Sequence, residues 1–393
     1  MGRRPGPSPK PCSGAAERGG RTLARLVQEM RALQIHAGPV ALKRLRERGL
    51  QPDDVRAIPA AAGGPKGLIL NPLDRFVFGQ WLPRSTQVVH LLGASIGAWR
   101  MASACLPDAD AALADLAADY IAQRYEHEPG KAPKPRHVSE LFGAKLRERF
   151  GGREHEVLSH PRFRLHVFTS RGVRALARDG RVRTPLGYLG AFASNAVSRR
   201  AMGGFLERVI FSDPRDKLPV PTHDYRTQHV ELASANLARS ILASCTIPFW
   251  LEAVDSIAGA PPGPYWDGGI TDYHLHLDYA ALANQQDASG AEGLVLYPHF
   301  QKTLVPGWLD KALRHRHRAS ARLANVVLLS PSPEWIATLP GGKIPDRGDF
   351  KAFGDDHDAR EFAWRRATDE SVRLAEEFDA LTRRSSIEAL PLS

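Results

Sequence analysis

The sequence predicts an α/β protein of three layers, in which a mostly parallel sheet lies between layers of helices. Residues 55–60 form an apolar, strand-like run, and a glycine-rich loop connects them to a helix-like run that ends near Phe78. Residues 87–92 form a second strand-like run, which a tight turn connects to the helix-like residues 98–105. Parallel neighbours need a long crossover connection, usually a helix, so this repeated strand–helix order indicates a parallel sheet.

The other elements are predicted from hydrophobic periodicity. Further strands are expected at residues 162–168, 229–232, 250–254, 293–297 and 325–329. Helices are expected at residues 23–49 with a break near 38–39, over most of 108–160, and at 188–202, 233–243 and 355–384. The last of these has the pattern of one long amphipathic helix.

The composition is that of a folded globular protein, with 43% hydrophobic and 24% charged residues in a chain of 393. No run of about 18 apolar residues is present, so the sequence predicts no membrane span. We expect a disordered basic tail at residues 1–22 and a single domain at 23–390. Within that domain, the motif core is expected at 55–280 and a helical C-terminal region at 300–390.

The cysteines and the basic tail together predict a cytoplasmic protein. The tail lacks the apolar segment of a secretory signal. Cys12, Cys105 and Cys245 have neither metal nor redox spacing, and their odd number suits a compartment without disulfides. Cys105 and Cys245 lie in apolar runs and are expected in the core.

The formal net charge of +10 favours anionic partners such as a phospholipid surface, an acidic substrate or nucleic acid. One dense basic run, at residues 311–322, contains Lys311, four arginines and two histidines. A solvated helix face is the alternative interpretation of this run, and a solubility bias is the alternative for the net charge. No aromatic residue interrupts the run, so nucleic acid is not expected, and peripheral contact with an anionic membrane is retained.

The first chemical motif is Gly93-Ala94-Ser95-Ile96-Gly97, which stands between a strand-like and a helix-like run. In that context G-x-S-x-G predicts a sharp turn that pushes the serine hydroxyl outward. The N-terminus of the following helix offers unpaired N–H groups to a negatively charged oxygen. The motif therefore predicts a nucleophilic serine, although an ordinary tight turn has the same pattern.

The second motif is the glycine-rich loop Gly63-Gly64-Pro65-Lys66-Gly67. Consecutive glycines allow successive N–H groups to point in one direction, as an oxyanion hole requires. A phosphate-binding P-loop needs Ser or Thr after the lysine, whereas Gly67 follows Lys66, so that alternative is disfavoured. A plain turn before a helix also remains open at this point.

The third motif is Asp267-Gly268-Gly269, which follows the loop at residues 258–264 and Trp266. Alone it is a common turn. Beside a nucleophilic serine it offers a carboxylate whose apolar neighbour Trp266 raises its proton affinity. Such a carboxylate is a candidate for the base that takes the serine proton.

In this order the three motifs resemble the patatin-like phospholipases, lipid acyl hydrolases with a catalytic Ser–Asp dyad. The glycine loop, the elbow and the Asp-Gly-Gly motif each match, and residues 238–248 resemble the helix and proline turn before the family's aspartate. The resemblance covers roughly residues 55–280. Two departures are Ala62, where the family has a glycine, and Ile270-Thr271-Asp272, where many relatives carry Asn-x-Pro.

The resemblance implies a patatin-like fold and assigns roles residue by residue. Ser95 corresponds to the nucleophile, Asp267 to the general base, and Gly63, Gly64 and Ile96 to the oxyanion donors. The residues expected to support these motifs are Lys66, Gly67, Gly93, Gly97, Gly268 and Gly269. The implied activity is hydrolysis of carboxylic esters of lipids or phospholipids through an acyl-enzyme, without a metal or organic cofactor.

Two other functions remain open. In a Ser-His-Asp carboxylesterase of small esters, one of His274, His276 and His299 would follow the acid in chain order. A catalytically inactive lipid-binding homologue is the second alternative. A metal site is not expected, because the histidine pairs at 274/276 and 315/317 lack a third ligand at motif spacing. The proline- and glycine-rich loop at 258–264 is a candidate lid or lipid-facing rim.

Overall fold

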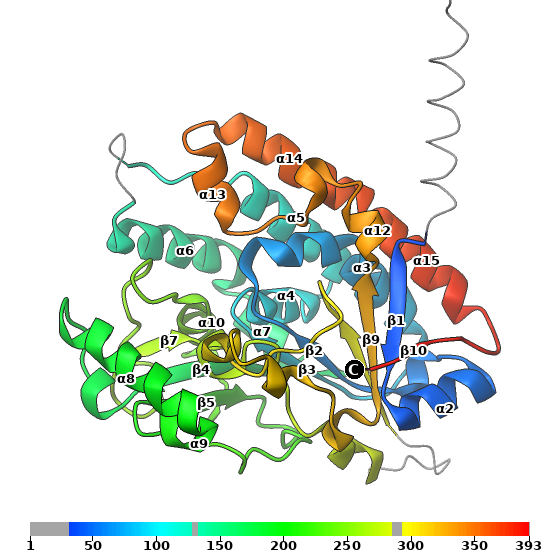
Figure 1. The fold of residues 1–393 in the computed structure, drawn as a ribbon, viewed down its shortest axis with the longest axis horizontal. Coiled ribbons are helices and arrows are strands. Elements are labelled where there is room, and N and C mark those ends of the chain that lie inside the picture. Colours follow the sequence, from blue (N-terminus) through cyan, green and yellow to red (C-terminus); the bar gives the residue numbers. More distant parts are fainter. Residues whose placement is uncertain (1–30, 128–132, 285–292, 393) are drawn as a thin grey trace, which may run out of the picture.

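The protein has a three-layer α/β fold built around one ten-stranded, mostly parallel mixed sheet (Figure 1). The computed structural model describes residues 31–127, 133–284 and 293–392. The expected basic tail at 1–22 lies outside the described residues. The strand order is β10-β1-β9-β8-β2-β3-β4-β5-β6, with β7 paired to β4 beside this path. The predicted fold class is therefore confirmed.

Five neighbouring strands, β9-β8-β2-β3-β4, run parallel and form the centre of the sheet. The strands are β1 (Leu33–Ala37), β2 (Val55–Ala60), β3 (Val89–Ala94), β4 (Phe163–Gly172), β5 (Leu206–Ser212), β6 (Thr227–Glu231), β7 (Tyr265–Asp267), β8 (Leu294–Pro298), β9 (Val326–Pro331) and β10 (Leu390–Pro391). Every residue of β2, β3, β8 and β9 is buried, as expected for strands that helices cover on both faces. Antiparallel pairs flank this parallel centre on both sides, since β1 runs antiparallel to β9 and β5 runs antiparallel to β4.

The helices that hold the site lie next to the central strands. The helices are α2 (Pro39–Arg48), α3 (Asn71–Phe76), α4 (Ile96–Ala104), α5 (Ala109–Ile121), α6 (Pro135–Phe150), α7 (Glu154–Leu158), α8 (Arg183–Val197), α9 (Arg199–Met202), α10 (Leu237–Cys245), α11 (Gly269–Asp272), α12 (Pro333–Ile336), α13 (Gly348–Phe353), α14 (His357–Glu370) and α15 (Val372–Thr382). Helix α4 packs on β2, β3 and β4, α10 packs on β4 and β7, and α11 packs on β4 and β5. Figure 1 shows α8 and α9 at one end of the molecule and α2 at the other.

Five expectations about elements are wrong. Residues 33–37, expected in a helix, form edge strand β1, because their alternating pattern pairs with the buried β9. Residues 250–254 contribute only an isolated bridge from Val254 to Tyr265. Residues 206–212, for which no strand was expected, form β5. The expected single helix at 355–384 is two helices, because it breaks at Ser371, whose hydroxyl donates to the carbonyl of Thr368.

The expected helix at 188–202 is also two helices, α8 and α9, because Ser198 between them is extended, with φ of −156° and ψ of 134°. The remaining expected strands and helices are present with shifted ends where the structure describes them. Cys105 and Cys245 are both buried, as expected, with free thiols. Within the described ranges, no helix combines the length and the apolar character that crossing a membrane requires.

Candidate active site

Ser95 lies at the sharp turn between β3 and α4, in a backbone conformation that residues other than glycine rarely adopt. Its φ is 57° and its ψ is −130°, and its side chain is almost fully buried. Such strain persists only where the surroundings enforce it, and it is concentrated at functional sites. The expected sharp turn is thus present as a strand–turn–helix with Ser95 at its tip, which is the geometry that a nucleophile elbow requires.

The two motif glycines allow this turn because backbone approaches them closely. A Cβ at Gly93 would lie 2.3 Å from Cα of Ala98, and a Cβ at Gly97 would lie 2.0 Å from the carbonyl oxygen of Ala60. Neither neighbour is a flexible side chain that could move aside. Gly93 therefore lets α4 fold back on β3, and Gly97 lets it pack on β2.

Asp267 ends the short strand β7 and faces the serine. Oγ of Ser95 donates a hydrogen bond to Oδ2 of Asp267 at 2.6 Å, across 172 residues of sequence. The other carboxylate oxygen accepts a hydrogen bond from the N–H of Gly269 at 2.7 Å. Burial raises the pKa of Asp267, against the opposing effects of Arg347 and of these two hydrogen bonds. Both partners are at least 90% buried, so the proton-accepting pair is shielded from bulk water.

Gly268 and Gly269 let the segment after Asp267 lie against its neighbours. A Cβ at Gly268 would lie 2.0 Å from the carbonyl oxygen of Phe168, and one at Gly269 would lie 2.5 Å from Cβ of Ala62. Helix α11 begins here, and its Asp272 is fastened by a buried ion pair to Arg208 of β5, with N–O distances of 2.6 and 2.7 Å. The base is therefore held from both sides.

Ser244, at the C-terminal end of α10, connects the elbow to the sheet. Its hydroxyl accepts a hydrogen bond from the N–H of Ser95 at 2.8 Å and donates one to the carbonyl of Phe168 at 2.6 Å. Nearby, the carbonyl of Thr246 accepts a hydrogen bond from the N–H of Asp267 at 2.7 Å. The stretch at 238–248 that resembles the family thus contacts both members of the dyad through the polar groups of Ser244 and Thr246.

The glycine loop lies beside the elbow and opens the 3₁₀ helix Gly64–Leu70. Gly64 has a φ of 57°, and a Cβ at Gly63 would lie 2.7 Å from the ring of Phe300. Among the described turns, loops and caps, no hydrogen bond is donated by the N–H of Gly63, Gly64 or Ile96. These three expected oxyanion donors are therefore not used to hold the protein's own backbone.

The departure at Ala62 causes no strain. Ala62 is not among the residues with positive φ, and its N–H donates to the carbonyl of Tyr273 at 2.9 Å. The Cβ of Ala62 packs closely against Gly269, because a Cβ added to Gly269 would lie only 2.5 Å from it. Alanine at this position packs the glycine loop against the turn that carries the base. Gly67 is in ordinary contact with Ile96, at 3.5 Å from an added Cβ, so no close approach requires a glycine there.

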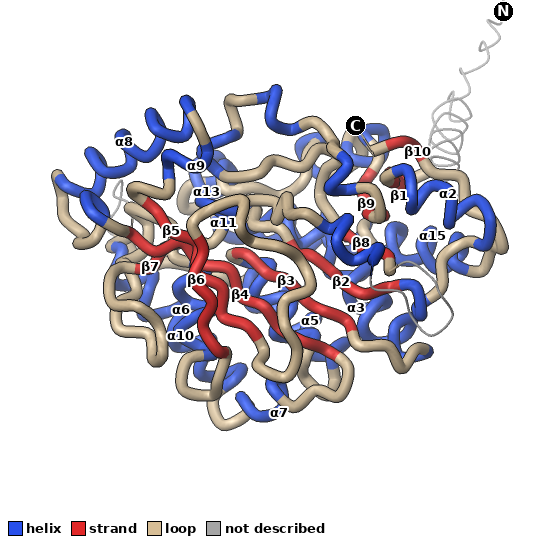
Figure 2. The backbone as a smooth tube through the Cα atoms, turned by 90° about the horizontal axis from the view of Figure 1, so that it is seen from below, coloured by secondary structure: helices blue, strands red, loops and turns tan. Residues whose placement is uncertain are grey.

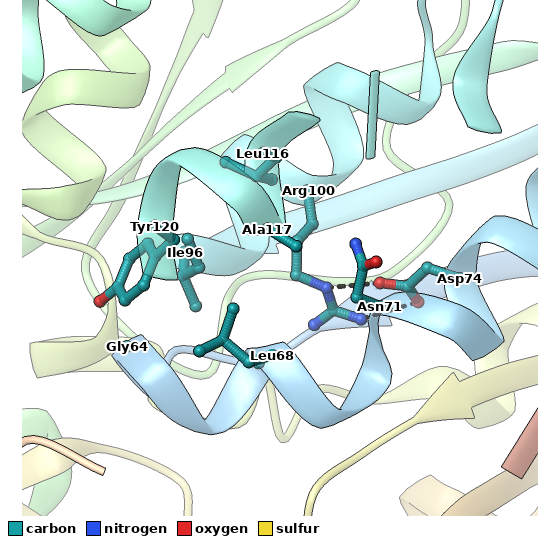
Figure 3. A pocket seen from close by; sticks show the side chains of 10 residues that line it. Gly64, Leu68, Asn71, Asp74, Ile96, Arg100, Leu116, Ala117 and Tyr120 are labelled. Carbon is teal, nitrogen blue, oxygen red and sulfur yellow. Dashed lines mark hydrogen bonds and ion pairs between the residues drawn. The ribbon is translucent and has the colours of Figure 1, made fainter. Parts of the chain in front are cut away.

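A small cavity of about 20 Å³ lies between the glycine loop and α4, behind the elbow (Figure 3). Gly64, Leu68 and Ile96 line it with Tyr120 and the ion pair of Arg100 with Asp74. Nε and Nη2 of Arg100 donate to the two oxygens of Asp74 at 2.7 and 2.8 Å, and both side chains are buried. Since Arg100 belongs to α4 and Asp74 to α3, this pair joins the helix after the nucleophile to the helix after the glycine loop.

Three cations lie within electrostatic reach of one another around the dyad: Lys66, Lys311 and Arg347. Positive charge from Arg347 and Lys311 lowers the pKa of Asp267 against its burial. The ammonium of Lys66 lies 5.1 Å from the ring centre of Phe300, and that of Lys311 lies 4.3 Å from that of Tyr273. None of the three makes an ion pair within the described parts of the chain, although Asp346 acts electrostatically on Lys66 and Asp267 on Lys311. They remain available to a negatively charged group.

Burial affects the two lysines in the same direction. Burial lowers the pKa of Lys66, with Asp346 opposing and neighbouring cations adding to the effect. It lowers the pKa of Lys311 to about 8, where Lys66 and Arg347 add to the effect and Asp267 opposes it. Lys311 also lines an open cleft of about 520 Å³ with Arg314, His317 and Arg318. Arg347 and Asp267 line a second, water-sized cavity beside Trp308. Cationic side chains therefore line both the cavity at Asp267 and the cleft at Lys311.

Two of the three histidines considered for a triad, His274 and His299, form hydrogen bonds with the backbone. Nδ1 of His274 accepts a hydrogen bond from the N–H of Val305 at 2.9 Å, and His299 bonds to the backbone of Gln301. The rings of His274 and His299 pack edge to face, 4.3 Å apart. Among the described residues, the one hydrogen bond recorded for Oγ of Ser95 goes to Asp267. No three His, Cys, Asp or Glu side chains of the described chain are grouped as a metal site requires.

The loop at 258–264 is fastened to the protein body. Three backbone carbonyls of the loop accept hydrogen bonds from side chains. Nδ2 of Asn236 donates to the carbonyl of Ala258, and the hydroxyl of Tyr265 donates to the carbonyl of Pro261. The guanidinium of Arg171 donates to the carbonyl of Pro262. Three side-chain hydrogen bonds along seven residues favour a fixed rim over a moving lid.

The fold brings the predicted residues Ser95 and Asp267 into hydrogen-bond contact, and it places Gly64 and Ile96 in the lining of one cavity, whereas sequence reasoning missed Ser244 and Arg347. Ser244 was visible only as part of the resembling stretch, and no motif marks Arg347. No protein-family model matches this chain, and no curated protein matches it.

Proposed function

We propose that the protein is a serine acyl hydrolase that works through a Ser95–Asp267 dyad. The observation that carries this proposal is the 2.6 Å hydrogen bond from Oγ of Ser95 to a buried carboxylate, on a turn with φ of 57°. A serine hydroxyl is a weak nucleophile until a base accepts its proton, and the geometry supplies that base directly.

In the proposed reaction, Oγ of Ser95 attacks the ester carbonyl while its proton passes to Oδ2 of Asp267. The carboxylic acid then protonates the leaving alcohol, which leaves an acyl-enzyme. In the second half, Asp267 takes a proton from water, the hydroxide attacks the acyl group, and the proton returns to Ser95. The N–H of Gly269 keeps Asp267 oriented throughout, because it bonds to the oxygen that does not face the serine.

The negative charge that develops on the carbonyl oxygen is assigned to the N–H groups of Gly63, Gly64 and Ile96. Preorganised donors of this kind stabilise the tetrahedral intermediate, and losing one typically costs on the order of a hundredfold in rate. Their lack of backbone partners among the described turns and caps supports this role.

The proposed substrate is a carboxylic ester that carries a negative charge, as phospholipids do. The support is the group of three cations at the mouth, none with an ion-pair partner in the described chain. Membership of the patatin-like family and a cytoplasmic location with peripheral membrane contact are parts of the same proposal.

The test is the activity of wild type, Ser95→Ala and Asp267→Asn on phospholipids, neutral lipids and short p-nitrophenyl esters. Either substitution should lower kcat by at least about a hundredfold. Ser103→Ala is the matched control, because Ser103 is a buried serine of α4 whose hydroxyl has no partner. A fluorophosphonate probe should label wild type at Ser95, and a chelator should leave turnover unchanged.

Two results would decide for the alternatives. Loss of turnover in a folded His274→Gln, His276→Gln or His299→Gln variant would replace the dyad with a triad. A folded wild type that neither reacts with the probe nor hydrolyses any ester of the panel would indicate an inactive lipid-binding homologue.

A further inference from the structure

Helix α8 presents an apolar face to solvent. Its fourteen residues from Thr184 to Val197 include no charged side chain. Large apolar side chains along and just before it are 46% to 85% exposed: Val182, Leu186, Leu189, Phe192 and Val197. Figures 1 and 2 show α8 on the outside of the molecule, at one end. A contiguous exposed face of this kind marks an interaction site more often than a plain surface.

Two exposed aromatic residues extend this face toward the active site. Phe249 and Trp250 are 58% and 53% exposed, and Phe249 has a φ of 70°. The ring of Tyr188, on the inner side of α8, lies 5.9 Å from that of Phe249 and 6.2 Å from that of Trp266. Trp266 directly precedes Asp267, so one buried tyrosine connects the apolar helix to the base of the dyad. The apolar face is defined here as seven residues: Val182, Leu186, Leu189, Phe192, Val197, Phe249 and Trp250.

Basic side chains stand at both ends of the apolar face. Arg178 and Arg181 are exposed before α8, Arg183 is the exposed first residue of α8, and Arg200 is exposed after it. The basic run at 311–322 lies at the same C-terminal end, because Arg316 reaches Asn195 and the carbonyl of Ala196, each at 3.4 Å. Arg314 and Arg318 of that run are exposed.

Acidic side chains near the apolar face are fewer. They are Asp179, Glu252 and Asp255. Asp179 is occupied, because it accepts hydrogen bonds from the N–H of Gly180 and the hydroxyl of Thr184. The surroundings of the face are therefore positively charged overall.

We propose that the apolar face docks the protein on an anionic lipid surface, with α8 lying in the plane of the interface. An uncharged helix face with basic residues at its ends has the chemistry of interfacial helices, whose apolar side enters the acyl boundary. The flanking arginines contact anionic headgroups while their aliphatic stems stay along the apolar layer. The orientation of Ser95 toward lipid rests on the proposed function, but docking itself does not.

The test measures co-sedimentation of the full chain with two kinds of vesicle, phosphatidylcholine alone and an equimolar mixture of phosphatidylcholine and phosphatidylglycerol. Wild type and Ser95→Ala should both bind the mixed vesicles, and binding should weaken at high salt. The triple variant Leu186→Gln/Leu189→Gln/Phe192→Gln should bind at least about tenfold more weakly, because the buried apolar area is lost. The variant Arg178→Gln/Arg181→Gln/Arg314→Gln/Arg318→Gln should lose a similar factor on mixed vesicles.

Matched controls come from α14, at another part of the surface. Phe362 is 69% exposed there, and Arg365 is exposed without an ion pair in the described chain. Phe362→Gln/Arg365→Gln should bind vesicles as wild type does. The thermal unfolding temperature of each variant shows whether it is folded.

Binding of the folded triple variant at wild-type strength would overturn the proposal, as would a wild type that binds neither vesicle. A wild type that forms dimers without vesicle binding, when the triple variant is a monomer, would make the face an interface between two copies instead. Vesicle binding by Ser95→Ala combined with an inactive wild type would refute the proposed hydrolase while leaving the docking surface intact.

Discussion

The hydroxyl of Ser244 lies between Ser95 and the sheet, since it accepts from the N–H of Ser95 at 2.8 Å and donates to the carbonyl of Phe168. Two backbone segments that belong to different parts of the chain are thereby satisfied by one small side chain. A buried polar group without a partner is costly, so this hydroxyl stabilises the strained turn. It also fixes the position of the Ser95 backbone relative to β4.

Replacing Ser244 should therefore affect turnover more than substrate binding. In Ser244→Ala, the N–H of Ser95 and the carbonyl of Phe168 lose their shared partner, at a cost of about 1–3 kcal/mol in stability. We expect a lower kcat with little change in KM. The control is Ser240→Ala on the same helix, where the lost hydrogen bond goes to Leu237 alone. Equal kinetics in the two variants would refute the positioning role.

The buried ion pair between Arg100 and Asp74 should be critical for stability. In Arg100→Met the carboxylate of Asp74 is left buried without its partner, which typically costs about 3–5 kcal/mol. The double variant Arg100→Met/Asp74→Leu should recover most of that loss, because no buried charge remains. Urea denaturation measures both.

The comparison pair for this measurement is the ion pair of Arg75 with Asp110. Nε of Arg75 lies 2.8 Å from Oδ1 of Asp110, and both side chains are partly exposed. Arg75→Met should cost less than about 1 kcal/mol. If Arg100→Met were no more destabilising than Arg75→Met, the ion pair would not be what joins α3 to α4.

The acid limb of the pH–activity profile should depend on Arg347. Asp267 must be ionised to accept the serine proton, and its pKa is raised by burial, so activity falls at a pH above the ordinary range of an aspartate. The positive charge of Arg347 opposes that rise. Arg347→Gln should therefore raise the pKa of Asp267 further and move the limb to higher pH.

The measurement is kcat/KM against pH on a neutral ester, so that no substrate charge is involved. Lys351→Gln serves as the control, since Lys351 is an exposed cation on α13, the helix that follows Arg347. An unchanged limb in Arg347→Gln would mean that Arg347 does not act on the base.

Binding of anionic esters should weaken in mild alkali because of Lys311. The pKa of this lysine is lowered to about 8, so its charge is lost as the pH rises through that value. KM for a negatively charged ester should then rise about fivefold, whereas KM for a neutral ester of the same chain length should stay constant. In Lys311→Gln the high KM should be present at every pH, and a pH-dependent KM that persists in this variant would implicate another group.

The sequence predicted the elbow and the base because their information is local. An apolar run, a G-x-S-x-G turn and a helix lie consecutively around Ser95, and glycines that allow close backbone contact follow Asp267 directly. The order of the motifs along the chain, which resembles that of a known family, then predicted that Ser95 and Asp267 pair although they are 172 residues apart.

The features that the sequence did not predict depend on contacts between distant segments. Arg347 comes from a loop with no motif, and it reaches Asp267 only because the C-terminal region folds back over the glycine loop. Residues 33–37 form a strand only because β9 is available as a partner more than 280 residues later. Hydrophobic periodicity within a short window predicts neither the interaction of Arg347 with Asp267 nor the pairing of β1 with β9.

The segment that carries α8 leaves the sheet after Gly172 and returns at Leu206, and these two residues are partners on the antiparallel ladder of β4 and β5. A chain excursion whose two ends are already adjacent can change in length or content at a modest loop-closure cost, with the strands on either side undisturbed. The exposed positions of residues 173–205 are therefore open to change, whereas Tyr188, which packs on Trp266, and Arg199, which bonds to Thr271 and Asp272, tie the segment to the turn that carries Asp267. Redesigning only the exposed side chains of α8 offers a way to redirect the protein to another interface while Ser95 and Asp267 keep their places.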